Sequence, residues 1–274
     1  MALLQGLRPR LNRALALRAV SLVCLLSLCA CYCAMTPGGD VMVLSRTRQL
    51  PVYSVERDDK VLAISFDAAW GGSQTPALLD ILDEYGVKTT FFLVGIWVER
   101  FPELVQEIIA RGHEIGNHST SHPEMSKLSE EKIREELAVT SDRIEALTGV
   151  RPTLFRPPYG DYNDRVVTVS RAEGYECVQW SVDSLDWKNR GVEELVRQAT
   201  RKIAPGDIVL FHNDSQFIVE ALPTILKTYQ DAGYTIVPVS EILLEGETAI
   251  DHTGRQHPVV SEQTPKQSET PEQI

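Results

Sequence analysis

Cysteine is almost absent from most of this chain. Of the five cysteines, Cys24, Cys29, Cys31 and Cys33 lie in one apolar segment, so only Cys177 remains elsewhere. A single thiol has no intrachain partner, which excludes a framework of disulfides. We expect Cys177 to be a buried thiol of the core.

Positive charge is also scarce. The 274 residues carry a formal net charge of −11, which becomes −15 once the four arginines of the acid-free segment 1–35 are set aside. Binding to the phosphates of a nucleic acid requires a basic surface. The sequence therefore excludes a nucleic-acid partner. Repeats of fixed period are lacking as well, which excludes a solenoid.

Residues 1–35 combine a basic start with an uncharged, mostly apolar run, AVSLVCLLSLCACYCAM, from Ala19 to Met35. This arrangement is typical of an export signal or a short membrane anchor. Basic residues before the run favour a cytoplasmic N-terminus. The body is therefore expected outside the cytoplasm, either anchored to the membrane through this segment or secreted after its cleavage.

The remaining chain divides by composition. Residues 36–57 contain Pro and Gly and are expected to form a stalk and lead-in, whereas residues 58–245 are expected to form one folded domain. Residues 246–274 are polar and almost free of aromatic side chains, so they cannot bury enough apolar surface to fold. We expect this last segment to be a disordered tail.

From Lys60 onward, short apolar runs alternate with helical patterns. The helical patterns begin at Pro76, Pro102 and Ser129 and end near glycines, as helix boundaries commonly do. The expected strands are VLAISF (61–66), TTFFLV (89–94), HEIGN (113–117), TLF (153–155), YECVQWSV (175–182), DIVLF (207–211) and YTIVPV (234–239). This rhythm predicts an α/β fold, a distorted parallel (β/α) barrel of about seven strands. A doubly wound open sheet is the alternative, but its glycine-rich phosphate loop is missing.

Polar residues follow five of the expected strands at their carboxyl ends. They are Asp67, His118, Arg156, Asp183 and His212. In a parallel barrel the carboxyl ends of the strands share one rim, where functional groups gather. His122 lies four residues after His118, a spacing that allows both imidazoles to reach one metal ion when the backbone between them is helical or tightly turned.

These residues fall in five motifs that resemble those of the polysaccharide deacetylases of carbohydrate esterase family 4, also called the NodB-homology domain. The resemblance covers about residues 58–245, and the motifs occur in the family's order. They are SFDAAWG (65–71), HSTSH (118–122), RPPYG (156–160), DSLDW (183–187) and LFH (210–212).

The resemblance implies a hydrolytic mechanism for an N-acetyl group. Asp67 would be the general base, Arg156 would orient it, and His212 would be the general acid, with Asp183 tuning its charge. Hydrolysis of an amide does require these tasks, because water must lose a proton and the departing amine must gain one.

The resemblance also implies a metal and a substrate groove. His118 and His122 would bind a divalent ion, with zinc expected and cobalt as an alternative. The backbone N–H of Tyr159 would face the developing oxyanion. Trp187 and Leu210 would form the wall that receives the acetyl methyl group.

One position departs from the family's pattern. The second aspartate of the first motif, the family's third protein ligand to the metal, is replaced by Ala68. The ion could be held by two histidines and water, by a substitute ligand from Asp67, Asp161 or Asn213, or not at all. We expect a retained metal with altered and weaker coordination, because the other catalytic positions are kept.

The expected function is therefore a metal-dependent hydrolase that removes N-acetyl groups from a cell-wall glycan. Peptidoglycan is the expected substrate, because the Ala-Ala-Trp-Gly version of the first motif resembles a sporulation-linked branch of the family. One alternative is a non-catalytic glycan-binding barrel that uses Trp70, Tyr159 and Trp187 as stacking surfaces. Another is an amidohydrolase of small cyclic amides, which the export segment disfavours.

Overall fold

The computed structural model describes residue 18, residues 20–25, residue 27 and residues 48–259. The chain separates into two units, residues 1–47 and residues 48–274, of which the second is the body. Most of the predicted signal or anchor, residues 1–35, lies outside the described residues, so that prediction stays a prediction. Among the described residues, no helix has both the length and the apolar character needed to cross a membrane.

The body is built on one parallel sheet. Seven strands form a continuous path in the order β6-β5-β4-β3-β2-β8-β7, and β9 pairs with the first part of β2. All of these pairings are parallel. The strands are β2 (Val61–Ala68), β3 (Thr90–Leu93), β4 (Glu114–Asn117), β5 (Leu154–Phe155), β6 (Glu176–Cys177), β7 (Val182–Asp183), β8 (Ile208–His212) and β9 (Thr235–Val237).

The sheet is curled rather than flat, as the connection between its two ends requires. Strands β6 and β7 end the path, yet only residues 178–181 separate them. Five extended steps span at most about 18 Å, whereas seven strands laid flat would separate the ends by about 29 Å. The predicted distorted (β/α) barrel is confirmed.

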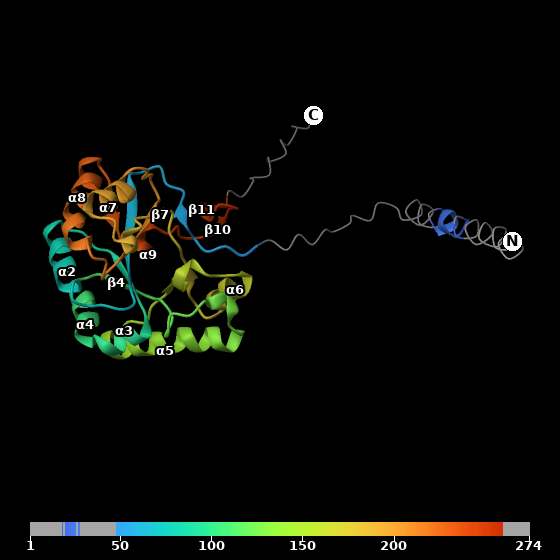
Figure 1. The fold of residues 1–274 in the computed structure, drawn as a ribbon, viewed down its shortest axis with the longest axis horizontal. Helices are drawn as coiled ribbons and strands as arrows, with labels where there is room; N and C mark the ends of the chain where they lie inside the picture. Colours follow the sequence, from blue (N-terminus) through green and yellow to red (C-terminus); the bar gives the residue numbers. More distant parts are fainter. Residues whose placement is uncertain (1–17, 19, 26, 28–47, 260–274) are drawn as a thin grey trace, which may run out of the picture. The chain divides into compact units, whose positions relative to one another are not determined.

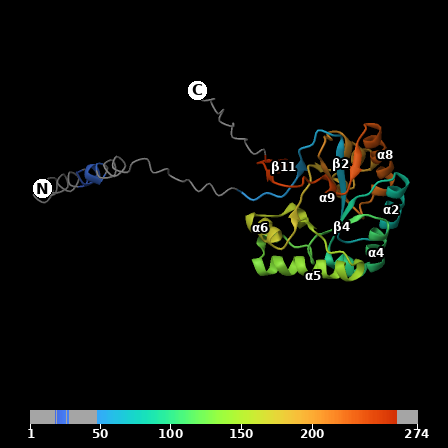
Figure 2. The same cartoon turned by 180° about the vertical axis from the view of Figure 1, so that it is seen from behind.

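Helices surround this barrel. They are α2 (Thr75–Glu84), α3 (Gly95–Arg100), α4 (Pro102–Ala110), α5 (Glu130–Thr148), α6 (Asp164–Ala172), α7 (Val192–Thr200), α8 (Ile218–Asp231) and α9 (Val239–Ile242). All but the short α9, whose buried residues belong to a hydrophobic cluster on the other face of the sheet, cover its outside. Figures 1 and 2 show α2, α4 and α8 along one flank of β2, with α5 running across the end of the body. The described residues also form three short 3-10 turns, η1 (Met125–Lys127), η2 (Pro158–Gly160) and η3 (Asp186–Lys188).

Two of the three hydrophobic clusters among the described residues pack against the centre of the sheet. The larger lies between the sheet and its helices, where Phe66 stacks on Phe91 and Phe211 with ring centroids 5.1 and 5.6 Å apart. The smaller cluster includes Phe92 and Ile208 and lies on the other face of the sheet. Because both faces are packed, the strands are apolar nearly throughout, as expected for a parallel sheet.

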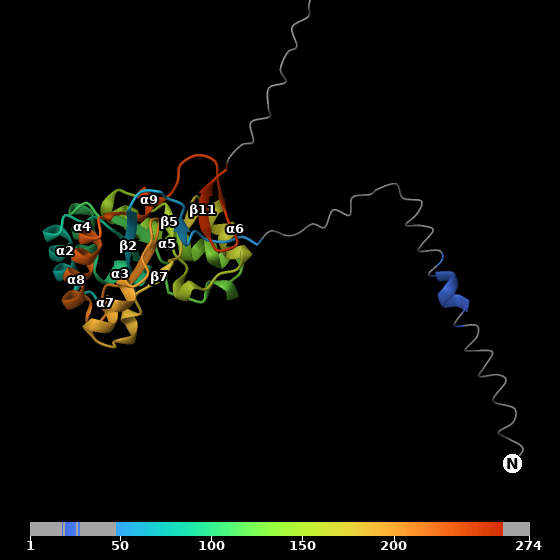
Figure 3. The ribbon, with the colours of Figure 1, turned by 90° about the horizontal axis from the view of Figure 1, so that it is seen from above.

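Two sequence predictions need correction. The run YECVQWSV (175–182) does not form one strand but divides into β6 and β7, the two ends of the sheet. Residues 246–274 are not wholly a disordered tail, because β10 (Thr248–Ile250) and β11 (Arg255–Pro258) form an antiparallel hairpin. Strand β1 (Ser54–Val55) of the lead-in pairs in parallel with β11, and this small sheet lies near α6 (Figure 3). The body therefore extends beyond the predicted limits 58–245.

Candidate active site

The five polar residues predicted at the barrel rim do lie at the carboxyl ends of their strands. Asp67, Asp183 and His212 belong to the last residues of β2, β7 and β8. His118 follows β4 directly, and Arg156 follows β5. Parallel pairing in register, with Asp67 opposite His212, brings them to one end of the sheet.

Asp67 is held by a buried arginine. Its Oδ1 accepts a hydrogen bond of 2.8 Å from Nη1 of Arg156, whose side chain is fully buried and whose Nη2 donates to the carbonyl of Gln179. Burial alone would raise the pKa of Asp67, but the charge of Arg156, the nearby His118 and His212, and the hydrogen bond together lower it below its ordinary value. Asp67 is thus an ionised carboxylate, as a general base must be.

His118 and His122 form a neutral pair beside this carboxylate. Nε2 of His118 lies 3.4 Å from Oδ2 of Asp67, while its Nδ1 lies 2.6 Å from the carbonyl oxygen of Arg156. The His118 and His122 rings are 5.0 Å apart. Burial lowers the pKa of both, and like charge from His118 helps lower that of His122 to about 4. Both imidazoles therefore keep a lone pair at neutral pH.

The donors around this pair fit a divalent cation only in part. Nδ1 of His122 is buried without a hydrogen-bond partner among the described residues, and neutral imidazoles are ligands that zinc prefers. However, within the described part of the chain, no three side chains of His, Cys, Asp or Glu gather as a metal-binding group. The set therefore offers two histidines and lacks a dedicated third ligand.

The resemblance to the family places the third ligand at position 68, where Ala68 is fully buried in the larger hydrophobic cluster. Of the three substitutes considered, Asp161 is engaged by the N–H and hydroxyl of Ser126. The amide nitrogen of Asn213 donates to Gly71 and Thr75, whereas its Oδ1 is buried without a hydrogen-bond partner among the described residues. Of the three, only Asp67 contacts a histidine, through its Oδ2 and Nε2 of His118. Its Oδ1 accepts a hydrogen bond from Arg156.

The loop that carries the histidines is supported by Glu136 of α5. The Glu136 carboxylate accepts hydrogen bonds of 2.8 Å from the N–H groups of Thr120 and Ser121, and one of 2.7 Å from the Ser121 hydroxyl. Ser119 and His122 have φ angles of 66° and 58°, in the left-handed region that side chains other than glycine rarely adopt. Glu136 therefore helps to stabilise a strained loop, and no motif in the sequence indicates it.

Replacing Glu136 with alanine should loosen this loop. We expect the free energy of unfolding to fall by about 2–3 kcal/mol, because hydrogen bonds to a charged acceptor are lost, and zinc affinity to fall about tenfold. Chemical denaturation and a zinc competition titration measure the two effects. Glu135→Ala is the matched control, because Glu135 is an exposed neighbour in a surface ion pair with Lys132. Equal zinc affinities for the two variants would show that Glu136 does not position the histidines.

His212 is held as a cation by Asp186. The buried Asp186 carboxylate lies 2.8 Å from Nδ1 of His212 and also accepts the backbone N–H of His212 at 2.7 Å. Burial would lower the pKa of His212, but the hydrogen bond and charge of Asp186, with Asp67 and Asp183 further away, raise it to about 9. His212 is therefore protonated at neutral pH, as a general acid must be.

Asp183 acts on His212 only through space. Its Oδ1 accepts the N–H of Leu185, and burial raises the pKa of this carboxyl group. The predicted tuning of His212 thus belongs chiefly to Asp186, the second aspartate of the same DSLDW motif. Sequence reasoning missed Asp186, although the motif itself contained the signal.

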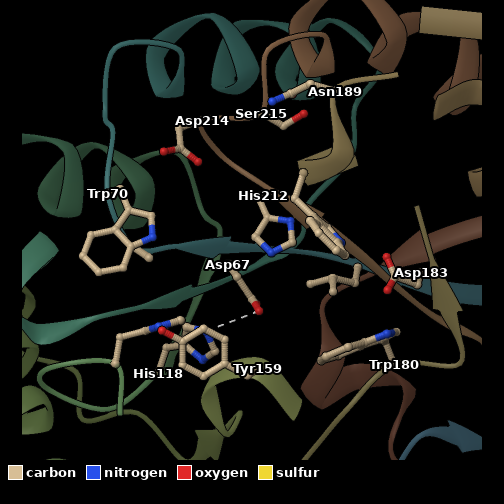
Figure 4. A pocket seen from close by; sticks show the side chains of 14 residues that line it. Asp67, Trp70, His118, Tyr159, Trp180, Asp183, Asn189, His212, Asp214 and Ser215 are labelled. Carbon is tan, nitrogen blue, oxygen red and sulfur yellow. Dashed lines mark ion pairs between the residues drawn. The ribbon is translucent and has the colours of Figure 1, made fainter. Parts of the chain in front are cut away.

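The site opens into a cavity of about 670 Å³ (Figure 4). Its lining includes Asp67, His212 and three residues predicted from the resemblance, namely Tyr159, Trp187 and Leu210. Tyr159 has a φ of 60°, a strained conformation of the kind found at functional sites. The predicted role of its N–H at an oxyanion stays a prediction. A cavity of this size suits a small organic ligand or part of a polymer.

Comparison with known proteins shows the family of this chain. The family model described as polysaccharide deacetylase matches residues 54–178. A peptidoglycan-N-acetylglucosamine deacetylase of Bacillus cereus is 39% identical over 196 residues, which are 70% of this chain and 92% of that protein. The chain belongs to the polysaccharide deacetylase family.

Two solved structures are also similar to this chain. Wild-type BA3943 of Bacillus anthracis, described as a family 4 pseudoenzyme, has a TM-score of 0.69 at 36% identity, covering 71% of this chain and 69% of its own. A BA3943 mutant, described as having restored enzymatic activity, has a TM-score of 0.69 at 37% identity and covers 71% of both chains. Similarity therefore extends to a deacetylase and to a pseudoenzyme.

Proposed function

We propose that this chain is a metal-dependent hydrolase that removes N-acetyl groups from a cell-wall glycan, with peptidoglycan as the substrate. The observation that carries the proposal is the pairing of opposite protonation states across one cavity. Asp67 is held ionised by Arg156, and His212 is held protonated by Asp186. Two groups whose environments drive their pKa values apart are what acid and base catalysis requires.

The protein's own residues account for both proton transfers. Asp67 removes a proton from the water that attacks the acetyl carbonyl, and His212 delivers a proton to the departing amine. His118 and His122 would hold a divalent ion, with zinc expected and cobalt as the alternative, and such an ion polarises a carbonyl and acidifies water. The N–H of Tyr159 would stabilise the oxyanion.

The similarity to glycan deacetylases supports an N-acetylated glycan rather than a small cyclic amide. Those relatives also support action outside the cytoplasm, where peptidoglycan lies, with residues 1–35 as signal or membrane anchor. The Ala-Ala-Trp-Gly sequence after Asp67 remains the reason to propose a sporulation-linked role.

A second candidate is a non-catalytic glycan-binding barrel. The burial of Ala68 in the apolar cluster favours it, because that position offers no ligand for a metal. Trp70, Tyr159 and Trp187 are more than half exposed and would still bind a sugar. Metal binding and acetate release separate this candidate from the first.

The test is elemental analysis of the purified protein, followed by acetate release from N-acetylated oligosaccharides with and without zinc or cobalt. We expect about one metal ion per chain and metal-dependent release. His118→Ala should lose both, because it removes half of the histidine ligands. Cys177→Ser is the control, because Cys177 lies in the core and burial raises the pKa of its thiol to about 12. Glycan binding without metal or acetate release would establish the second candidate instead.

A further inference from the structure

Two residues of the cavity wall have no part in the acid and base chemistry. Trp70 follows β2 and is 56% exposed, and Asp214 follows β8. Both line the cavity. In Figure 4 they lie together on one side of Asp67 and His212.

The backbone beside Trp70 is fixed by hydrogen bonds. The N–H of Gly71 donates to Oδ2 of Asp214 at 2.9 Å, and its carbonyl accepts from Nε1 of Trp97 and Nδ2 of Asn213, each at 2.8 Å. A Cβ atom at position 71 would lie 3.0 Å from Cβ of Asp214, so a side chain there would push Asp214 away. An aromatic ring on such a fixed loop loses little entropy when a ligand binds.

Large exposed hydrophobic side chains are few in the described body. They are Trp70, Ile96, Val150, Tyr159, Trp187 and Val259. All three aromatic side chains of this group line the cavity, whereas the aliphatic ones do not. Aromatic rings that remain in water around one cavity indicate a surface made for a ligand.

We propose that Trp70 and Asp214 form a binding subsite for a neighbouring sugar unit, next to the unit whose acetyl group reaches Asp67. The indole ring would stack on the apolar C–H face of a pyranose. One oxygen of Asp214 accepts the Gly71 N–H, and no described residue hydrogen-bonds the other, Oδ1, which would accept a sugar hydroxyl. This inference rests on the proposed glycan substrate.

The opposite side of the centre carries a similar pair. Trp180 and Asp183 line the cavity there, across Asp67 and His212 from Trp70 and Asp214 (Figure 4). A glycan that contacts Trp70 and Asp214 at one side and Trp180 and Asp183 at the other would pass over Asp67 and His212, with sugar units on either side of them. The substrate is therefore an oligosaccharide bound through an internal unit rather than a single amino sugar.

The test is calorimetric binding of N-acetylglucosamine oligomers of one to six units to the full chain. Affinity of the unaltered protein should rise with length. Trp70→Ala should lower affinity for the tetramer about tenfold or more and leave that for the monomer nearly unchanged, because only the longer ligand reaches the subsite. Trp70→Phe should restore most of the loss, and Asp214→Asn should show a smaller loss. Val150→Ala, which removes an equally exposed side chain outside the cavity, is the control.

Two results would overturn the subsite. One is an affinity that does not rise with oligomer length, including no binding at all. The other is an equal loss for monomer and tetramer in Trp70→Ala, which would mean that Trp70 acts through His122, 5.6 Å away between ring centroids. Acetate release is measured separately, so length-dependent binding without turnover would uphold the subsite while refuting the hydrolase.

Discussion

Replacing Ala68 with aspartate is expected to raise the affinity of this protein for zinc by about 10- to 100-fold. The two histidines lack a dedicated third ligand among the described residues, and the resemblance to the family implies that this ligand belongs at position 68. A carboxylate there adds an anionic oxygen beside two neutral imidazoles. Acetate release at limiting zinc should rise in parallel, because more of the protein would then hold an ion that polarises the acetyl carbonyl.

The same substitution should destabilise the metal-free protein. Ala68 is fully buried among apolar side chains, so a carboxylate there is desolvated until a cation binds. Melting temperature should therefore fall without zinc and recover with zinc. Ala68→Asn is the matched control, because it has nearly the same volume without the charge. Equal zinc dissociation constants for Ala68→Asp and the unaltered protein would mean that this position does not face the ion.

Replacing Asp186 with asparagine should move the alkaline limit of activity to lower pH. His212 must be protonated to act as an acid, and its pKa of about 9 means that activity is retained at neutral pH and lost as pH rises through that value. Without the Asp186 charge, burial should return the pKa to its ordinary value of 6.5 or below. At pH 8 the protonated fraction would then fall from most molecules to about one in thirty.

Two measurements check this expectation. The pH dependence of kcat/KM reports the acid in the free enzyme, and NMR titration of the His212 ring reports its pKa even if the protein has no turnover. Asp183→Asn is the control, and its shift should be smaller because Asp183 lacks a direct hydrogen bond to His212. A larger shift for Asp183→Asn than for Asp186→Asn would reverse the roles assigned to these two carboxylates.

The barrel and the rim were predictable because they follow from local rules. Apolar runs bounded by Pro and Gly mark the strands and helices, and parallel strands place Asp67 and His212 at the same end. Which side chains hydrogen-bond to one another does not follow from such rules. Whether Asp183 or Asp186 meets His212 depends on the turn after β7, where Leu185 has a φ of 54°. Glu136 likewise reaches the histidine loop from a helix, at a distance in sequence that no motif records.

The hairpin β10 and β11 escaped prediction for a different reason. Its sequence around Thr248 and Gln256 is polar and lacks alternation of apolar and polar residues. These strands are short, and their order depends on pairing with β1, about 200 residues earlier. Strands this short that depend in part on a distant partner carry little signal of their own.

That pairing also sets the order in which the body can be completed during synthesis. Strand β1 is translated first, and its partner β11 follows only about 200 residues later, at a synthesis rate of about 5–20 residues per second. Until β11 has been made, the edge of β1 that pairs with β11 in the folded protein has no strand beside it. A fragment cut at residue 245 would keep that edge open permanently, and open edges promote association between chains. Expression ending after Val259 should therefore yield monomeric protein more readily than expression ending at Glu245.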